Sequence, residues 1–366
     1  MRRTSPLIVG GGPAGAAAAI ALARAGTPPL LLDRNREAPD HLCGGFLGWD
    51  ALAALDALGI DPVGLGARPI HRVRLIAGDI MVEAALPYRA AGLSRRTLDA
   101  ALLAQAIHAG AGVEQGVVAR ALDPSSRTLR LADGGELRPD ALFLATGKQD
   151  LRGAARPREA GGPDPAVGLR TRLAPSPALA SALEGVIELH LFRSGYAGLL
   201  LQEDGATNLC MSVARSRFAA AGARADDLLA DLAESPRLLD RIGQAVACDP
   251  WQAVAAIPYG WRAQETEPGL FRLGDQAAVI ASLAGDGVAI ALASGRLAAR
   301  HYAAGAAGAA PAFQRAFAAT ARRPLAVAGG LRRLAESSGA PPLLRLFGNV
   351  PGLAALLARA TRIKQR

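Results

Sequence analysis

The sequence is poor in aromatic residues, cysteines and long apolar runs. Aromatic residues make up 4% of the 366 residues, so we expect leucine, valine and alanine to fill most of the core. No segment has about 18 uncharged apolar residues in a row, which predicts that no part of the chain spans a membrane. The three cysteines, Cys43, Cys210 and Cys248, lie far apart without metal-ligand spacing. We therefore expect no disulfide scaffold and no metal site, and the composition fits a reducing cytoplasm.

The balance of charge favours some partners over others. Lysine and arginine number 41 against 32 aspartates and glutamates, a formal charge of +9, and arginine far outnumbers lysine. This excess favours an anionic cofactor or an anionic surface. The arginines are scattered and accompany no nucleic-acid-binding motif, so a general arginine bias explains them better than nucleic-acid binding.

The segment from Leu7 to Gly15 carries the strongest local pattern. An apolar run too short for a signal peptide leads into Gly10, Gly12 and Gly15, and an alanine-rich segment follows. This order predicts a buried strand, a tight turn and a helix. In such a turn Gly10 permits the bend, Gly12 the approach of a pyrophosphate, and Gly15 close packing of the helix on the strand. A second strand ends in Asp33, where an acidic residue is expected to bind a ribose hydroxyl.

The rest of the chain alternates strand and helix patterns. Residues 72–86 predict a hairpin, and Ser94 is placed to cap a helix. A segment rich in glycine, proline and arginine, residues 148–165, indicates a crossover between domains. Strand patterns dominate residues 167–214. Helices are expected from residue 286 onward, broken at Pro324, Pro341-Pro342 and Pro351.

Four separated stretches together resemble one family. In chain order they are Gly10 to Gly15 with Asp33, Arg95-x-x-Leu98-Asp99, Ala145-Thr146-Gly147, and Gly274-Asp275 with Gly285-Asp286-Gly287. As a set they resemble the FAD-dependent oxidoreductases of the aromatic hydroxylase and geranylgeranyl reductase superfamily, over most of the chain. The resemblance implies an α/β fold: a three-layer, Rossmann-type FAD-binding domain with a parallel sheet, an inserted antiparallel-sheet substrate domain and a helical C-terminus.

The resemblance and the composition together imply a discontinuous domain organisation. We expect an FAD-binding domain made of residues 1–68, 92–165 and 266–322. The substrate-binding sheet domain would comprise residues 69–91 and 166–265, and residues 323–366 would form a C-terminal helical segment.

The resemblance also assigns residues to the cofactor. It places Asp275 on the ribityl or pyrophosphate part of FAD, and Arg95, rather than its neighbour Arg96, on the phosphates or adenosine. It places a helix N-terminus at Gly285 to Val288 beside the flavin ring, which suits the negative charge that a reduced flavin carries near N1 and O2. The expected cofactor-binding residues are Gly10, Gly12, Pro13, Ala14, Gly15, Asp33, Arg34, Cys43, Gly44, Gly45, Arg95, Val118, Thr146, Gly147, Gly274, Asp275, Gly285, Asp286, Gly287 and Val288.

The reaction stays open between several alternatives. With NAD(P)H as electron donor, the superfamily's chemistry would hydroxylate an apolar or aromatic substrate or reduce a carbon–carbon double bond. The Tyr-x-Trp-x-Phe-Pro signature of prenyl reductases has only a partial match at Tyr196 to Leu201, so we favour hydroxylation. No second glycine fingerprint exists for NAD(P)H, which would bind transiently or be replaced by a protein that reduces the flavin. A non-catalytic flavin-binding or electron-transfer protein is the alternative from another class.

Few side chains stand out as catalytic candidates. Glu188 and His190 lie on one face of a predicted strand, which would face either the substrate or the solvent. Cys43 has no base beside it in sequence, so we interpret it as a small residue packed near the flavin. The remaining histidines show no ligand spacing: His41, His71, His108 and His301.

The C-terminal segment, Leu353 to Arg366, combines leucines with a basic end. This pattern favours a helix that docks on the protein over peripheral contact with a membrane surface. Its basic residues are Arg359, Arg362, Lys364 and Arg366.

Overall fold

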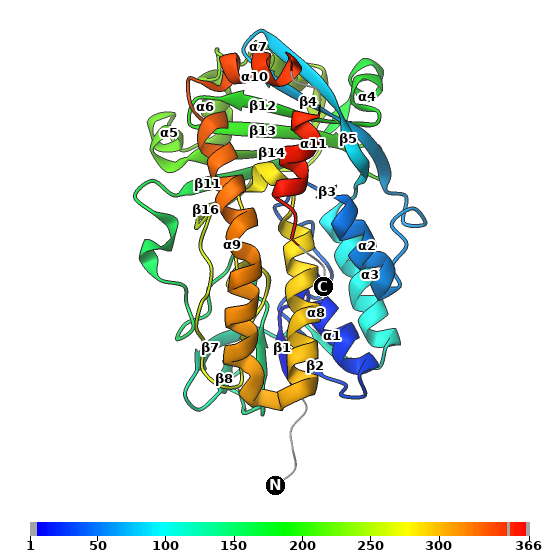
Figure 1. The fold of residues 1–366 in the computed structure, drawn as a ribbon, viewed down its shortest axis with the longest axis vertical. Coiled ribbons are helices and arrows are strands. Elements are labelled where there is room, and N and C mark those ends of the chain that lie inside the picture. Colours follow the sequence, from blue (N-terminus) through cyan, green and yellow to red (C-terminus); the bar gives the residue numbers. More distant parts are fainter. Residues whose placement is uncertain (1–5, 350–351, 364–366) are drawn as a thin grey trace.

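The computed structural model describes residues 6–349 and 352–363. At one end of the molecule lies a five-stranded parallel sheet, sheet A, with the strand order β17-β10-β1-β2-β6 (Figure 1). Except for the edge strand β6, which is mostly exposed, its short strands are apolar and largely buried, as expected where both faces are covered. They are β1 (Leu7–Val9), β2 (Leu30–Asp33), β6 (Gly112–Gln115), β10 (Leu142–Leu144) and β17 (Leu270–Arg272).

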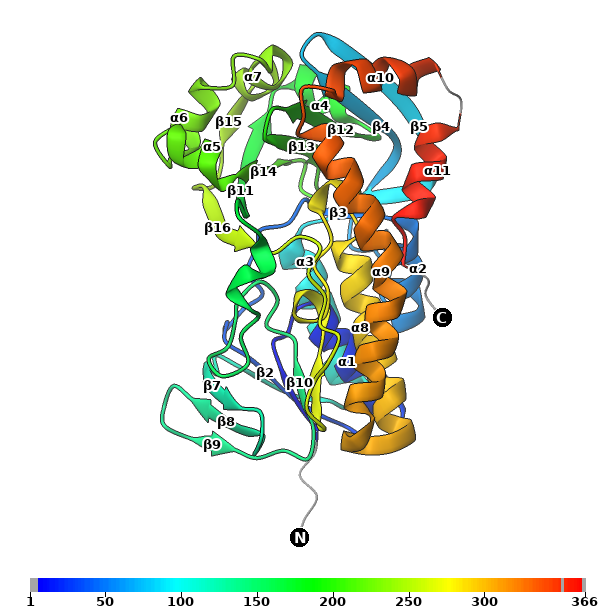
Figure 2. The same cartoon turned by 60° about the vertical axis from the view of Figure 1, so that its left-hand side comes forward.

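Helices cover one face of sheet A and a small antiparallel sheet covers the other, so three layers result (Figure 2). The helices are α1 (Pro13–Arg24), α2 (Trp49–Leu58), α3 (Arg95–His108), α8 (Gly287–Gly305) and α9 (Ala310–Ala335). The small sheet consists of β7 (Ala119–Asp123), β8 (Thr128–Leu131) and β9 (Glu136–Leu137). The expected three-layer, parallel-sheet domain is thereby confirmed.

The alanine-rich composition of α1 has a packing reason. Gly295 in α8 lies against α1, and a Cβ atom there would come within 2.3 Å of the carbonyl oxygen of Ala14. Only small residues permit two helix backbones to approach so closely. This contact packs the beginning of α1 against the middle of α8, and the beginnings of both helices matter for the site described below.

The second sheet, sheet B, lies at the other end of the molecule and is mostly antiparallel, except that β12 pairs with β4 in parallel. Helices α4 (Pro177–Leu183), α6 (Ala225–Ala230) and α7 (Pro236–Gly243) bury a core against one of its faces, with the short α5 (Arg215–Ala220) beside them. Its strands are β3 (Phe46–Leu47), β4 (Arg68–Ala77), β5 (Ile80–Gly92), β11 (Ala166–Pro175), β12 (Val186–Phe192), β13 (Gly195–Leu201), β14 (Thr207–Ala214), β15 (Ala245–Ala247) and β16 (Gln252–Ile257).

The C-terminal helices join the two ends of the molecule. Helix α9 runs along α8 toward sheet B, where α10 (Ala340–Asn349) lies over β4 and β5, and α11 (Leu353–Ala360) returns along β5 (Figures 1 and 2). The prediction of a break at Pro324 is wrong, because α9 continues through it. Pro324 costs the helix a hydrogen bond, but the buried stripe that includes Phe313, Phe317 and Leu325 holds both halves on the core. Pro341 and Pro342 lie in the first turn of α10, where no backbone donor is needed, and Pro351 lies outside the described residues.

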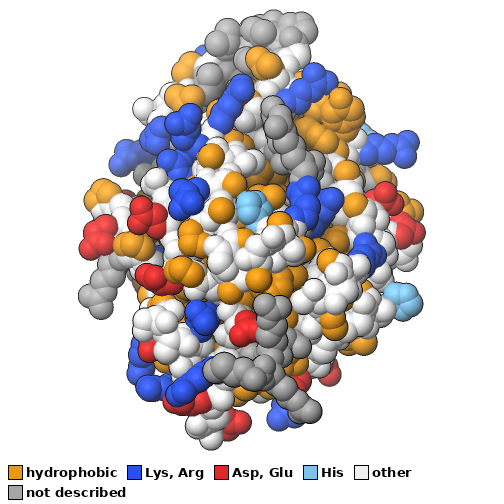
Figure 3. Space-filling model, turned by 60° about the horizontal axis from the view of Figure 1, so that its bottom comes forward, with side chains coloured by type: hydrophobic (Ala, Val, Ile, Leu, Met, Phe, Trp, Pro, Cys, Tyr) orange, Lys and Arg blue, Asp and Glu red, His pale blue; other side chains and the backbone are white. Residues whose placement is uncertain are grey.

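Basic side chains are spread over the surface, as the scattered arginines of the sequence predict. On the face shown in Figure 3, basic side chains lie in several places among acidic and apolar ones, without one continuous basic patch. Among the residues that the structure describes, no helix has the length and apolarity needed to cross a bilayer.

Candidate active site

One large cavity, of about 360 Å³, lies where the carboxyl ends of sheet A meet sheet B. One part of its wall comes from the glycine turns before α1 and α8, from the loop before β3 and from the loops after β10 and β17. The other part comes from apolar side chains of sheet B and of the C-terminal helices. The cavity therefore joins a polar cradle to an apolar chamber.

The turn between β1 and α1 is shaped for a phosphate group. Gly10 has φ +107°, and a Cβ atom on it would lie 2.4 Å from the carbonyl oxygen of Ala145. A Cβ on Gly15 would lie 1.9 Å from the carbonyl oxygen of Gly10, so both positions require glycine. Gly12, at the N-cap of α1, lines the cavity and supplies no capping side chain. The first N–H groups of α1 thus stay available to an anionic ligand.

Two side chains lie against this turn. The carboxylate of Asp33 accepts a hydrogen bond of 2.6 Å from the N–H of Gly11, beside the cavity rather than in its lining. Arg95 lines the cavity next to Gly12, and its guanidinium pairs with Asp99 at 2.6 Å. Ser94 caps the helix that carries Arg95 by accepting a hydrogen bond from the N–H of Thr97, as the sequence predicts.

An ion pair lies further along the cavity wall. The Lys148 ammonium is 3.6 Å from a carboxylate oxygen of Asp275, and both residues line the cavity. Burial alone would lower the pKa of Lys148, but nearby negative groups, Asp275 foremost, together more than offset it, and the pKa lies above its ordinary value. Sequence reasoning missed Lys148, although its place directly after Ala145-Thr146-Gly147 and the rarity of lysine in this chain were available signals.

The second glycine turn leads into α8. Gly285 has φ +72°, and a Cβ on it would meet the ring of Phe46 at 2.7 Å. Gly287 and Val288, at the start of α8, line the cavity, and no side chain caps this helix either. Two uncapped helix N-termini therefore face one cavity. A cofactor with a pyrophosphate at one place and a ring that gains negative charge at another fits this arrangement.

The comparisons with known sequences agree with this geometry. Residues 3–123 match the model of the protein family described as FAD binding domain. A stretch of 124 residues is 34% identical to geranylgeranyl diphosphate reductase, chloroplastic, from Oryza sativa subsp. japonica. That match covers 32% of this chain and 26% of the reductase, about a quarter of its length.

Residues 3–123 thus resemble an FAD-binding domain.

Solved structures show the same fold over nearly the whole chain. A flavin-dependent brominase has a TM-score of 0.78 at 16% identity, over 98% of this chain and 93% of that one. A geranylgeranyl bacteriochlorophyll reductase-like protein from Thermoplasma acidophilum has 0.76 at 18% identity, over 98% and 96%. A probable FAD-dependent monooxygenase from Pseudomonas aeruginosa has 0.69 at 17%, over 92% and 97%. The chain shares the fold of these flavin-dependent proteins, and together with the match of residues 3–123 this confirms the resemblance found in the sequence.

The predicted FAD-binding residues divide into two groups. Twelve line the cavity: Gly12, Pro13, Ala14, Cys43, Gly44, Arg95, Gly147, Gly274, Asp275, Gly285, Gly287 and Val288. Eight lie outside its lining: Gly10, Gly15, Asp33, Arg34, Gly45, Val118, Thr146 and Asp286. Gly10 and Gly15 shape the first turn, whereas Val118 is 39% exposed beyond sheet A. For all of these residues, contact with FAD stays a prediction.

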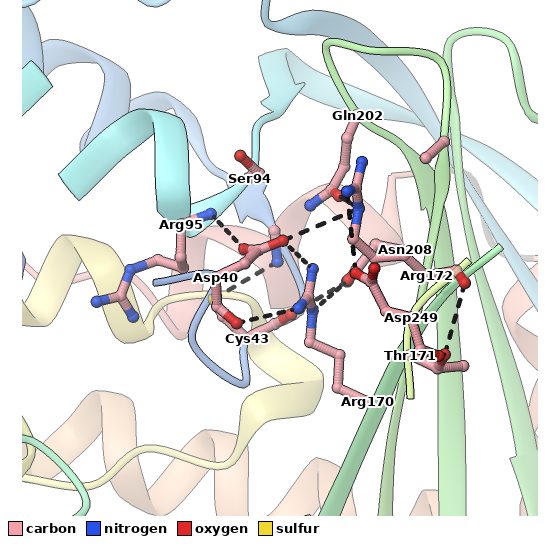
Figure 4. Close-up of polar contacts among 12 residues, drawn as sticks. Asp40, Cys43, Ser94, Arg95, Arg170, Thr171, Arg172, Gln202, Asn208 and Asp249 are labelled. Carbon is pink, nitrogen blue, oxygen red and sulfur yellow. Dashed lines mark hydrogen bonds and ion pairs between the residues drawn. The ribbon is translucent and has the colours of Figure 1, made fainter. Parts of the chain in front are cut away.

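The loop that holds Cys43 is tethered from sheet B (Figure 4). The side-chain amide of Asn208 donates hydrogen bonds to the carbonyl oxygens of Cys43 and Gly44, at 3.0 and 2.9 Å. Arg170, 1% exposed, donates to Asn208 at 2.6 Å and forms an ion pair with Asp40 at 2.5 Å. The sequence offered no signal for this tether, because its members are far apart in the chain. It fixes the loop against the cavity.

Three hydroxyl groups meet in the cavity wall. Ser282 Oγ lies 2.5 Å from the hydroxyl of Tyr196 and 2.6 Å from that of Tyr259, and all three residues line the cavity. Burial raises the pKa of Tyr196 well above its ordinary value, so its proton stays in place at neutral pH. Sequence reasoning noted Tyr196 only as part of an incomplete signature and missed this cluster.

Glu188 and His190 are neither solvated nor in the cavity, so both interpretations made from the sequence are wrong. Strand β12 presents Ile187, Leu189 and Leu191 to the cavity. The residues between them in the sequence, Glu188 and His190, lie on the opposite face of the strand. Glu188 is 0% exposed there and pairs with Arg74 at 2.5 Å and Arg241 of α7 at 3.0 Å. His190 lies 3.2 Å from Glu188. Helices α4 and α7 cover this face, which alternation within one strand cannot reveal.

The surroundings of His41 and Cys210 shift the pKa of both side chains. Burial, with the charge of Arg95 beside it, lowers the pKa of His41 to about 4, so it adds no positive charge to the phosphate end at neutral pH. Burial raises the pKa of Cys210, which lines the cavity, to about 12, so its thiol stays protonated. Neither residue is placed to act as a nucleophile or base.

Replacing Asp275 by alanine is expected to weaken FAD binding by about 1–3 kcal/mol, the worth of one charge-assisted hydrogen bond. The fold should survive, because the backbone of Asp275 is held separately by Arg156 at 3.1 Å. Fluorescence titration of the apoprotein with FAD measures the affinity, and circular dichroism checks the fold. The control is Asp133→Ala, an exposed turn residue far from the cavity. Equal affinities for the two variants would contradict a role of Asp275 in FAD binding.

Proposed function

We propose that this protein is an FAD-dependent oxidoreductase that hydroxylates an apolar substrate with NAD(P)H as electron donor. The observation that supports this most is the continuity of the cavity, from the two helix N-termini to the apolar face of sheet B. A bound flavin and an apolar molecule would share one space.

The chamber beside the cradle is apolar on both sides. Sheet B contributes aliphatic side chains such as Val73, Ile187 and Leu200, and the opposite wall comes from α9, α10 and α11 through Leu331, Leu344 and Leu357. Such walls favour apolar ligands, because a polar substrate would lose its hydration without compensating hydrogen bonds. The polar exceptions are the three hydroxyls around Ser282, which can fix the orientation of one polar group on the substrate.

The residues of the chain have distinct tasks in this proposal. When bound, FAD supplies the redox chemistry, the activation of dioxygen or the transfer of hydride. The start of α1 with Arg95 holds the pyrophosphate, and the Lys148–Asp275 pair holds the adjoining part of the cofactor. The start of α8 stabilises negative charge on the flavin ring. Tyr196 holds a proton next to Ser282 at the boundary between cradle and chamber.

Double-bond reduction is the second candidate. It is supported by the 34% identity to a geranylgeranyl diphosphate reductase and by the aliphatic lining of the chamber. The two reactions differ in atom balance. Hydroxylation places one oxygen atom of O₂ in the product and releases the other as water, whereas reduction adds two hydrogen atoms and needs no oxygen.

The two reactions are separated by isotope labelling. The purified holoprotein, checked for releasable FAD, is incubated with NADPH, ¹⁸O₂ and a panel of phenols and unsaturated lipids, and product masses are recorded. A product heavier by one ¹⁸O atom supports hydroxylation, and a product heavier by two hydrogen atoms, formed also without oxygen, supports reduction. Failure to bind FAD would overturn both. Flavin that is reduced and reoxidised without product would favour the non-catalytic alternative.

A further inference from the structure

We propose that the C-terminal segment sets the reduction potential of the flavin through Arg362, which neutralises Asp286 at the start of α8. The inference rests on FAD binding as part of the proposed function, but not on which reaction follows. In this proposal the C-terminal segment does more than pack against the rest of the protein, because its Arg362 adjusts the charge beside the flavin.

Arg362 reaches deep into the protein from the residues that follow α11. Its side chain is only 10% exposed and lines the cavity that also contains Gly285 and Gly287. The guanidinium forms an ion pair with Asp286 and lies 4.2 Å from the centre of the Trp49 ring. Its Nε is 3.9 Å from a carboxylate oxygen of Asp50. The segment thus brings a buried cation to the beginnings of α8 and α2.

Asp286 is a buried carboxylate that requires a positive partner. Its side chain is 0% exposed, and neither carboxylate oxygen accepts a hydrogen bond within the described part of the chain. A buried carboxylate is costly unless it is paired. Arg362 supplies the cation that pairs with it. The two groups therefore depend on each other.

The charges at this place decide how well a reduced flavin is stabilised. A helix N-terminus acts roughly as half a positive charge. The carboxylate of Asp286 next to it would outweigh that half charge and make the flavin end negative. With Arg362 in place, the pair cancels and the positive end of α8 remains. The ion pair therefore favours the reduced flavin, which carries negative charge near N1 and O2.

The potential of the bound flavin tests this charge balance in the full-length holoprotein. Reductive titration against an indicator dye, followed by flavin absorbance, gives the two-electron midpoint potential. In Arg362→Gln, binding of reduced relative to oxidised flavin should weaken about tenfold, which equals about 30 mV toward a more negative potential. Asp286→Asn should shift the potential in the opposite direction, and the double variant should lie near the wild type. Arg362→Lys keeps the charge and should keep the potential.

The opposite signs distinguish an electrostatic role from a structural one. If Arg362 only tethered the C-terminal segment, both single variants would lose the same tether and would shift the potential in the same direction or not at all. Either result would overturn the inference. Arg359→Gln is the matched control, since Arg359 lies in the same segment but is exposed and stacks on Tyr88. A protein that binds no FAD would overturn the inference and the proposed function together, whereas FAD binding without hydroxylation leaves the inference standing.

Discussion

Replacing Arg170 by methionine is expected to lower the free energy of unfolding by about 3–5 kcal/mol, the usual cost of removing one partner of a buried ion pair. Arg170 is 1% exposed and Asp40 is 6% exposed, so the carboxylate would stay buried without its main partner. Asn208 would also lose the guanidinium that holds its side chain. Because Asn208 tethers the loop of Cys43 and Gly44, the variant should retain less FAD as well.

Urea denaturation at one fixed FAD concentration measures the change in unfolding free energy. Arg130→Met is the control: that arginine is 69% exposed in its side chain, and its loss should change stability by less than about 0.5 kcal/mol. Adding Asp40→Asn to Arg170→Met should restore part of the stability, because the unpaired charge is then removed. Equal losses for Arg170→Met and Arg130→Met would show that the buried pair does not hold the loop.

The cofactor end of the site could be predicted because its signals are local. Gly10 is required by its positive φ and by the close approach of Ala145, and a strand, a turn and a helix surround it in the expected order. The stretches at Cys43, Arg95 and Asp275 also reach the same cavity, although about 230 residues separate the first from the last. These stretches were assigned through the resemblance of the whole motif set to one family, and that resemblance is carried by the sequence itself.

The residues that were missed or misplaced depend on contacts between distant segments. Alternation along β12 shows correctly that Glu188 and His190 share a face, but not that α7 covers that face. The same holds for Arg362, whose burial depends on Trp49 and Asp286 from other parts of the fold. Pro324 was misjudged for a related reason, since the local cost of proline is offset by burial of the neighbouring helix stripe. Local sequence patterns predict which residues share one face of a helix or strand. They do not predict which distant segment packs against that face.

Replacing Glu188 by glutamine is expected to destabilise the protein by about 3 kcal/mol at pH 7 without changing its FAD content. The fully buried carboxylate pairs with Arg74, Arg241 and His190, and the amide would leave these groups without a negative charge between them. FAD content should stay the same, because none of the four residues lines the cavity. Glu136→Gln is the control, an ion-paired glutamate that is 42% exposed, and it should leave stability nearly unchanged.

The pH dependence of stability tests the same cluster more sharply. Burial alone would raise the pKa of Glu188, but hydrogen bonds from His190, Arg241 and Arg74 lower it from 4.5 to about 2. Since the folded-state pKa lies below the unfolded one, the stabilisation is fully present above pH 4.5 and is lost as the pH falls toward 2. The difference in unfolding free energy between wild type and Glu188→Gln should therefore be constant from pH 7 to about 5 and shrink below pH 4.5. A difference that stays constant down to pH 3, measured by urea denaturation, would show that the charge of Glu188 does not stabilise the fold.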